Sequence, residues 1–348
     1  MPDSLRDLLD LGLCCPRCRG DLVPDVQSGE GTLRCGACGT SYPVILGIPD
    51  LRIFADPYIE IEPDRAKGRR LLAEGGRTWE DMVRFYYSVT RDTVPADQAD
   101  QFAAGLFAAR AVSDALLTTW DGIDPDPSSA QHLLEIGCGT APLLVAAGDR
   151  AVVKVGVDIA FRWLVVGRQR LKDAGVAAHL VCACAEALPF RDARFDLVTT
   201  QGALENVRDQ GLAMGEISRL MTPGGRLHIA TANRFSLGPD PHLGLPAGGL
   251  MPERLTSAYA RSKGALPPQR HLLSLSGLAR LLRHAGLGAR RYSVPGILAA
   301  QRRGRGVVFA FAAAVYELTR RLPVIRQVLF LIGPTLIATA RKPAAHSA

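Results

Sequence analysis

Two short cysteine pairs near the start of the chain constrain its fold more than any other feature. Cys15 and Cys18 enclose a Pro and an Arg, Cys35 and Cys38 enclose a Gly and an Ala, and sixteen residues separate the pairs. This spacing allows four thiolates to converge on one zinc ion in a tetrahedral site. Two disulfides are the alternative, which a reducing compartment disfavours. The pattern predicts a small structural zinc ribbon whose folding depends on the metal.

The ribbon is expected to occupy residues 1–55. Cys14 also precedes the first pair, but we favour Cys15 as ligand because its spacing to Cys18 repeats the spacing of the second pair. The run from Leu13 to Asp50 ends in Tyr-Pro-Val-x-x-Gly-Ile-Pro and resembles the small zinc-ribbon proteins that act as partners of tRNA and protein methyltransferases. That resemblance indicates a protein class and says little about a substrate.

A second pattern begins after the Pro-, Asp- and Ser-rich stretch 121–130. Residues 133–142 read Leu-Leu-Glu-Ile-Gly-Cys-Gly-Thr-Ala-Pro, an apolar strand that ends in a glycine turn before a helix. The next apolar strand closes on Asp158, about twenty residues past the turn, where a carboxylate can accept both hydroxyls of a ribose. Strands and helices alternate up to residue 232, which predicts an α/β fold with a parallel sheet.

Residues 133–232 resemble the class I S-adenosylmethionine-dependent methyltransferases, in particular the type 11-like group whose third motif reads Ala-Glu-Ala-Leu-Pro-Phe, here residues 185–190. The resemblance implies a Rossmann-like sheet of seven strands with helices on both faces, and S-adenosylmethionine as the methyl donor. It also implies the cofactor-binding residues: Glu135, Gly137 and Gly139 beside the methionine part, Asp158 at the ribose, Ile159, Ala185 and Glu186 around the adenine, and Gln201 near the sulfonium.

The chain departs from the family pattern at two positions. Ala141 replaces the last glycine of the turn, and Cys184 stands where many relatives have an aspartate that receives the adenine amino group. The loss of one polar contact costs on the order of 1 kcal/mol. A dinucleotide-binding dehydrogenase is disfavoured because Pro142 stands where its third glycine belongs.

The remaining sequence suggests three further segments. Residues 56–128 are expected to form a helical linker that covers the cofactor cleft, where Tyr86 and Tyr87 either line the cleft or pack. Residues 129–348 are expected to form the methyltransferase domain, with insertions at about 233–270 and 297–327. Long insertions in compact domains tend to be lids or binding loops, so we assign the first one to the acceptor site.

Methyl transfer from a sulfonium needs alignment and desolvation more than a catalytic triad. If the acceptor is a hydroxyl or an amine, a positioned base can take its proton. The candidates are Glu205 after the fourth strand and His242 in the long loop after the fifth. Either side chain can instead serve the structure, Glu205 at a helix start and His242 as a loop filler.

The charge distribution bears on the acceptor. The net charge is +7, but the residues from Arg280 onward hold twelve cationic side chains and one acid, Glu317, so the other 279 residues carry a net of minus four. Because the ribbon and linker are not basic, and few aromatic residues are interleaved with basic ones, a small-molecule or lipid-linked acceptor methylated at O, N or C is favoured. An RNA methyltransferase and a non-catalytic binding protein are the alternatives.

The segment 297–327 joins arginine clusters to apolar stretches. Such a segment can lie on an anionic membrane or cover a lipid-like acceptor, and a lid helix with a solvated basic side is the plainer alternative. No signal peptide is visible and the apolar runs are too short to span a bilayer. The protein is expected in the cytoplasm. The basic C-terminal segment additionally suggests peripheral contact with the inner face of the membrane.

Overall fold

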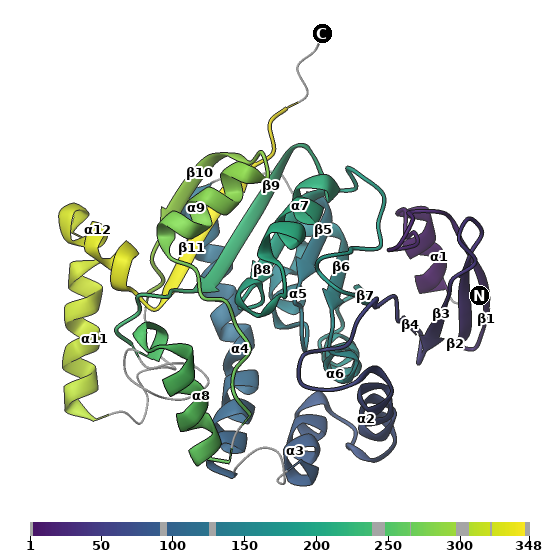
Figure 1. Ribbon diagram of the computed structural model, residues 1–348, viewed down its shortest axis with the longest axis horizontal. Coiled ribbons are helices and arrows are strands. Elements are labelled where there is room, and N and C mark those ends of the chain that lie inside the picture. Colours follow the sequence, from purple (N-terminus) through teal and green to yellow (C-terminus); the bar gives the residue numbers. More distant parts are fainter. Residues whose placement is uncertain are drawn as a thin grey trace.

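The computed structural model describes residues 3–90, 96–124, 130–238, 248–264, 266–296, 306–320 and 322–344. Figure 1 shows a central twisted sheet with helices on both faces, a small N-terminal domain at one side and a pair of C-terminal helices at the opposite side. His242 lies outside the described residues.

The N-terminal domain is one helix and a small antiparallel sheet with strands in chain order. Leu5 and Leu8 of the helix are buried, and so are Leu33 and Val44 of the sheet. The elements are α1 (Asp3–Asp10), β1 (Leu22–Gln27), β2 (Glu30–Cys35), β3 (Ser41–Ile45) and β4 (Ile48–Pro49).

The main sheet has seven strands in the order β10-β11-β9-β8-β5-β6-β7. Neighbouring strands from β9 to β7 are parallel, whereas β11 runs antiparallel to both β9 and β10. This arrangement confirms the predicted seven-stranded Rossmann-like sheet. The strands are β5 (Ala130–Ile136), β6 (Ala151–Asp158), β7 (His179–Cys182), β8 (Phe195–Gln201), β9 (Met221–Ala232), β10 (Gly288–Ser293) and β11 (Thr335–Arg341).

Helices cover both faces of this sheet, as predicted. Parallel strands are buried on both sides, and most positions of β5 and β8 are accordingly buried. One face carries α5 (Pro142–Ala147) and α6 (Phe161–Asp173), and the other carries α7 (Gln210–Leu220) and α9 (Leu275–His284). Short 3₁₀ turns lie at Gly148–Arg150, Leu204–Asn206 and Gly248–Leu250.

Three helices fill most of the segment between the two domains: α2 (Ile61–Glu74), α3 (Trp79–Val89) and α4 (Ala96–Ile123). Thr78 and Asp81 form a reciprocal capping box that starts α3. Helices α2 and α3 pack on α6, and α4 packs on α5 and the β10–β11 edge. These helices therefore thicken the layer on one face of the main sheet.

Both predicted insertions contain helices. The described part of 233–270 holds α8 (Glu253–Ser262), and the C-terminal insertion holds α11 (Val307–Thr319) and α12 (Pro323–Ile332), which runs past the expected end at residue 327. Within the described part of the chain, no helix combines the length and apolar character needed to cross a membrane.

Candidate functional site

A cavity of about 320 Å³ opens at the carboxyl ends of β5, β6 and β8. In open parallel sheets, ligands bind at this edge, where the strand order reverses. Five of the residues expected to contact the cofactor line the cavity: Gly137, Asp158, Ile159, Ala185 and Glu186. Glu135, Gly139 and Gln201 lie next to it without lining it.

The turn after β5 brings the backbone close to this cavity. Gly137 and Gly139 have φ angles of +73° and +48°, which favour glycine. A Cβ atom on Gly137 would lie 2.0 Å from the Cβ of Ala203, on the opposite wall. Only glycine fits at position 137, because any larger residue would push the turn and the loop at Ala203 apart.

Asp158 ends β6 at the centre of the cavity wall. Its carboxylate accepts hydrogen bonds from the backbone N–H groups of Gly139 (2.7 Å) and Ala160 (2.8 Å). Burial raises the pKa of Asp158 to about 6, and the nearby Asp56 carboxylate acts in the same direction. Asp158 is thus held in place by the glycine turn and by the start of α6.

Glu135 lies behind the turn and is 2% exposed. One carboxylate oxygen, Oε2, has no hydrogen-bond partner. Burial raises the pKa of Glu135 well above its usual range, and the charge of Asp158 adds to the effect. An unpartnered buried acceptor of this kind fits a ligand that brings a positively charged donor, such as the amino group of the methionine part of S-adenosylmethionine.

Glu186 and Gln201 have partners within the protein. Oε1 of Glu186 accepts hydrogen bonds from the backbone N–H groups of Arg208 (2.7 Å) and Asp209 (3.2 Å) and so fixes the loop before α7. Oε1 of Gln201 accepts one from the hydroxyl of Ser113 in α4 (3.0 Å). Both contacts organise the loops around the cavity.

A wall of the cavity comes from residues that the sequence analysis did not single out. Residues 50–58, which we call the strap, connect β4 to α2, and Phe54, Asp56, Pro57 and Tyr58 of the strap line the cavity. The strap begins as an extension of the main sheet, since the N–H of Leu51 donates to the carbonyl of Cys182 (2.7 Å). These contacts join residues more than 100 positions apart, so no local sequence pattern predicts them.

Cys184 contacts this strap directly. Its thiol donates a weak hydrogen bond of 3.6 Å to the carbonyl of Phe54, and the side chain is fully buried. Burial raises the pKa of the thiol to about 11. Cys184, which stands where many relatives have an aspartate, therefore holds the strap in place.

A buried ionic cluster fastens the strap to α2 and α6. Arg52 donates to Asp50 (2.6 Å), to Asp64 of α2 (2.8 Å) and to the carbonyl of Ile159 (3.0 Å), beside the cavity. Asp64 also accepts from the Arg162 guanidinium (2.8 Å) and from the N–H of Phe161 (2.7 Å), the first residue of α6. The side chains of Asp50, Arg52 and Asp64 are 0% exposed. Every charge here has a partner, as burial requires.

Among the described residues, helices α2 to α4 contribute no side chain to the cavity lining. Trp163 of α6 lines it, and Tyr86 packs behind Trp163 with ring centroids 4.6 Å apart, while Tyr87 packs on both rings. The two tyrosines are therefore packing residues that support an aromatic wall, and the strap covers the cavity in place of the expected helices.

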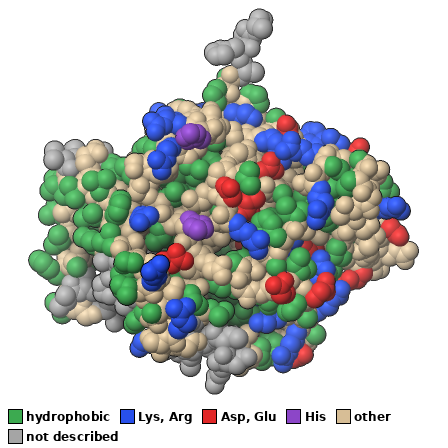
Figure 2. Space-filling view, viewed as in Figure 1, with side chains coloured by type: hydrophobic (Ala, Val, Ile, Leu, Met, Phe, Trp, Pro, Cys, Tyr) green, Lys and Arg blue, Asp and Glu red, His purple; other side chains and the backbone are tan. Residues whose placement is uncertain are grey.

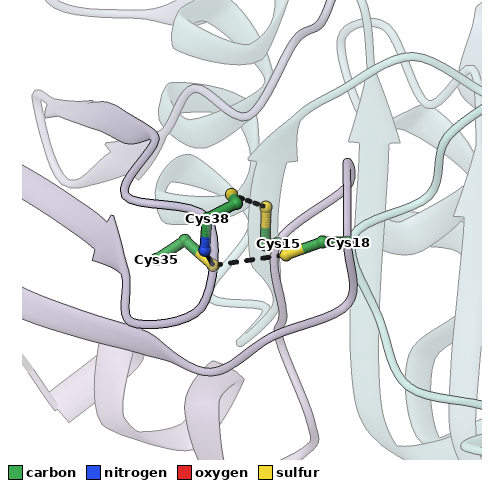
Figure 3. Close-up of side chains that lie close together, drawn as sticks. All are labelled: Cys15, Cys18, Cys35 and Cys38. Atoms are coloured by element: carbon green, nitrogen blue, oxygen red, sulfur yellow. Dashed lines mark hydrogen bonds between the residues drawn. The ribbon is translucent and has the colours of Figure 1, made fainter.

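The four cysteines of the two pairs come together in the N-terminal domain. Figure 3 shows their sulfur atoms turned toward one another from two facing loops. All four sulfurs lie within 4.8 Å of one another, with 3.7 Å between Cys15 and Cys38 and 3.4 Å between Cys18 and Cys35. Zinc–sulfur bonds of about 2.3 Å give tetrahedron edges of about 3.8 Å. The arrangement fits zinc, and Cys14 stays outside it.

The two candidate bases have different outcomes. Both oxygens of Glu205 are engaged, by the hydroxyl of Thr231 (2.7 Å) and the N–H of Ala232 (3.3 Å), and the side chain is buried. It does not line the cavity at the glycine turn. We therefore assign Glu205 a structural role at the end of β9, and His242 stays a prediction.

A second cavity, of about 450 Å³, adjoins the first. The two share five lining residues: Pro57, Tyr58, Asn206, Val207 and Arg208. The far side of the second cavity is formed by 253–271, including Glu253, Ser257, Arg270 and His271. The N–H of Gln269 donates to the hydroxyl of Tyr58 (2.8 Å), which ties this segment to the strap.

Two protein families match the chain. The family described as methyltransferase domain matches residues 134–229, and the family described as Trm112p-like protein matches residues 6–47. These ranges contain the glycine turn with Asp158 and all four clustered cysteines, respectively.

Curated relatives match the region around the first cavity. The ubiquinone/menaquinone biosynthesis C-methyltransferase UbiE of Xylella fastidiosa is 36% identical over 166 residues, which are 43% of this chain and 66% of the relative. UbiE of Vibrio cholerae is 38% identical over 129 residues, 34% of this chain and 49% of the relative. The chain thus spans about half to two thirds of the length of these relatives.

A solved structure of phosphoethanolamine N-methyltransferase 2 from Haemonchus contortus, in complex with S-adenosyl-L-methionine, has a TM-score of 0.45 and 19% identity, covering 66% of this chain and 52% of that one. The ordered motifs, the seven-stranded sheet and the two family matches identify a methyltransferase domain of the class I, type 11-like kind, preceded by a Trm112p-like zinc ribbon.

Proposed function

We propose that the protein transfers a methyl group from S-adenosylmethionine to a small-molecule or lipid-like acceptor. The observation that carries the proposal is the pair of adjoining cavities, one at the glycine turn and Asp158 and the other between the strap and residues 253–271. When bound, S-adenosylmethionine supplies an electrophilic methyl group on a sulfonium. Gly137 and Asp158 would hold it in the first cavity, with the unpartnered Oε2 of Glu135 behind the turn.

The second cavity would receive the acceptor. Its far side belongs to the first insertion, which the sequence assigned to the acceptor site. Asn206 and Arg208 contribute to both cavities, so an acceptor there would lie next to the donor, and such proximity supplies much of the rate enhancement in transfer reactions. The UbiE relatives are C-methyltransferases of ubiquinone and menaquinone biosynthesis, which supports a carbon acceptor of the quinone-precursor kind.

Methylation of RNA is the second candidate function, because the Trm112p-like match is consistent with the resemblance of the ribbon to partners of tRNA methyltransferases. The ribbon and linker lack the positive charge that phosphate contacts require. The small or lipid-like acceptor remains our proposal. The cytoplasmic location remains a prediction.

Two measurements test the proposal. Calorimetry should detect S-adenosylmethionine binding, and binding should be lost in Gly137→Val, where the added side chain collides with Ala203 and displaces the turn. Incubation of the protein with labelled cofactor and cell extract should then place the label in an organic-solvent or small-molecule fraction. Absence of binding at millimolar cofactor would exclude every methyltransferase function, and label that ribonuclease removes would support the RNA alternative.

A variant pair in α8 tests the acceptor cavity. Ser257→Trp should fill the second cavity, leaving cofactor binding intact while label transfer falls. Leu255→Trp, on the same helix but outside the cavity lining and exposed to solvent, is the matched control and should transfer normally. Equal transfer by both variants would place the acceptor elsewhere.

A further inference from the structure

Helices α11 and α12 present an apolar surface to the outside of the molecule. Val307 is 85% exposed, Phe311 72% and Leu318 62%. In Figure 2 the side of the molecule that carries these helices is largely hydrophobic. We define the outer face as the exposed apolar residues Val307, Phe311, Val315, Leu318, Leu322, Ile325, Val328 and Leu331. Within each helix their spacing of three or four residues places them along one side, and Leu322 directly precedes α12.

The polar groups of α11 face the opposite way. Glu317 and Arg320 form an ion pair at 2.5 Å, with side chains 15% and 33% exposed, and both lie against Gly296 of the protein body. The hydroxyl of Tyr316 donates to the carbonyl of Pro295 (2.8 Å). In water, an amphipathic helix turns its apolar side inward. Helix α11 is apolar along almost its whole length, and its charged pair lies on the protein side, so the side chains left in water are apolar. Such an exposed apolar surface is typical of a site that an apolar medium covers.

The charge of the sequence segment that holds these helices bears on the medium. Between residues 301 and 332 the sequence holds six arginines and one acid, and that acid is the paired Glu317. Arg302, Arg303 and Arg305 precede α11 and lie outside the described residues. A net charge of plus five opposes contact with a second copy of the same face and favours an anionic surface.

The helix lengths fit a surface orientation. At about 1.5 Å per residue, the 13 residues of α11 and the 10 of α12 reach only about 20 and 15 Å, short of the roughly 30 Å hydrocarbon core. We propose that the outer face docks onto an anionic lipid bilayer, with both helices in the plane of the headgroups. This inference is independent of the methyl-transfer activity.

The docked helices would also lie near the proposed acceptor side. The amide of Asn233, at the start of the first insertion, donates to the carbonyls of Leu331 (2.9 Å) and Gly333 (2.8 Å) at the end of α12. Arg234 and Leu273 are then joined by a backbone hydrogen bond of 2.9 Å, close to the end of the segment that forms the second cavity. A bilayer under α12 would therefore adjoin the route by which a lipid-like acceptor arrives.

Vesicle sedimentation of the full, zinc-loaded chain tests the proposal. The protein should bind vesicles containing phosphatidylglycerol, bind phosphatidylcholine vesicles far less, and dissociate as salt is raised. The double variant Phe311→Glu, Leu318→Glu should weaken binding about tenfold or more, because it puts charge where apolar contact is needed. Leu212→Glu, at a helical position 60% exposed on α7, is the matched control and should bind normally.

Two further arms separate the alternatives. Changing Arg302, Arg303 and Arg305 together to Gln should remove the preference for phosphatidylglycerol and leave the helices intact by circular dichroism. Light scattering without lipid should give the same mass for the wild type and the Phe311→Glu, Leu318→Glu variant. Failure to sediment with phosphatidylglycerol vesicles, or an oligomer that the double variant dissociates, would overturn the proposal.

Discussion

At the scale of single residues, Asp158 links cofactor binding to pH. Its pKa is raised to about 6, chiefly by burial, and only the ionised carboxylate can accept both ribose hydroxyls. Binding must therefore drive off a proton at low pH. Calorimetry should find S-adenosylmethionine affinity constant above pH 7 and about tenfold weaker at pH 5 than at pH 7.5.

The Asp158→Asn variant is the control for this pH dependence. It should bind weakly at every pH because the amide cannot accept both hydroxyls without also presenting a donor. A wild-type affinity that does not change between pH 5 and 7.5 would contradict the assignment. In the protein without cofactor, the raised pKa of Asp158 also affects the stability of the fold. The folded state binds the proton more tightly than the unfolded state, so the fold gains stability below the ordinary pKa of 3.8. This contribution is lost as pH rises through 6.

Ala141 holds strain in the turn before α5. Its φ of +58° and ψ of +34° lie in the left-handed region, which costs a residue with a Cβ roughly 1–2 kcal/mol. Ala141→Gly should therefore raise the free energy of unfolding, by about 1 kcal/mol in urea denaturation. Ala146→Gly, inside α5, should lower it by roughly 0.5–1 kcal/mol. Equal effects of the two substitutions would argue against strain at Ala141.

At the scale of elements, the strap and α6 depend on one buried carboxylate. Asp64 joins Arg52 of the strap to Arg162 and the first N–H group of α6. Asp64→Asn should lower the free energy of unfolding by about 3 kcal/mol, because it removes one carboxylate charge from each of two buried guanidinium groups, Arg52 and Arg162. Cofactor affinity should fall as well, since Arg52 also holds the carbonyl of Ile159 at the cavity.

Glu62→Gln supplies the matched control for that experiment. Glu62 lies on the same helix α2 and pairs with Arg65, but its side chain is 78% exposed. An exposed ion pair contributes about 0–1 kcal/mol, so denaturation and calorimetry should both stay near wild type. If Asp64→Asn behaves like Glu62→Gln, the buried cluster does not position the strap.

At the scale of the whole molecule, the zinc ribbon and the cofactor cavity form one structural unit. The ribbon contacts the main domain through backbone hydrogen bonds from Cys14 to Pro189 (2.9 Å) and from Arg191 to Gly12 (2.9 Å). The strap leaves the ribbon at Asp50 and reaches the cavity at Phe54. The metal-binding domain is therefore followed directly by the strap, which forms one wall of the proposed cofactor cavity.

Removal of zinc should accordingly weaken cofactor binding. A chelator that unfolds the ribbon removes the domain to which the strap is attached. If only a tenth of the molecules then keep the strap in place, the apparent affinity for S-adenosylmethionine falls about tenfold. Calorimetry before chelation, after chelation and after the return of zinc measures this. A chelated protein with zinc released and affinity unchanged would separate the two sites.

Local sequence patterns determined a large part of this protein. The cysteine spacing predicted the thiol cluster, and the strand, turn and strand around Gly137 and Asp158 predicted the sheet and its cavity edge. These features are readable because each depends on residues close together in the chain. Turn geometry, apolar runs and metal-ligand spacing all belong to that class.

Tertiary structure alone decided the rest. Contacts between distant segments make the strap a wall of the cavity, hold it against Cys184 and pack Tyr86 against Trp163. The side of α11 that stays exposed likewise depends on what the body of the protein leaves uncovered, because a helix that is apolar almost throughout does not itself determine which side faces inward. Chain proximity fixes local geometry, whereas the packing of distant segments fixes which surfaces meet a ligand, a lipid or water.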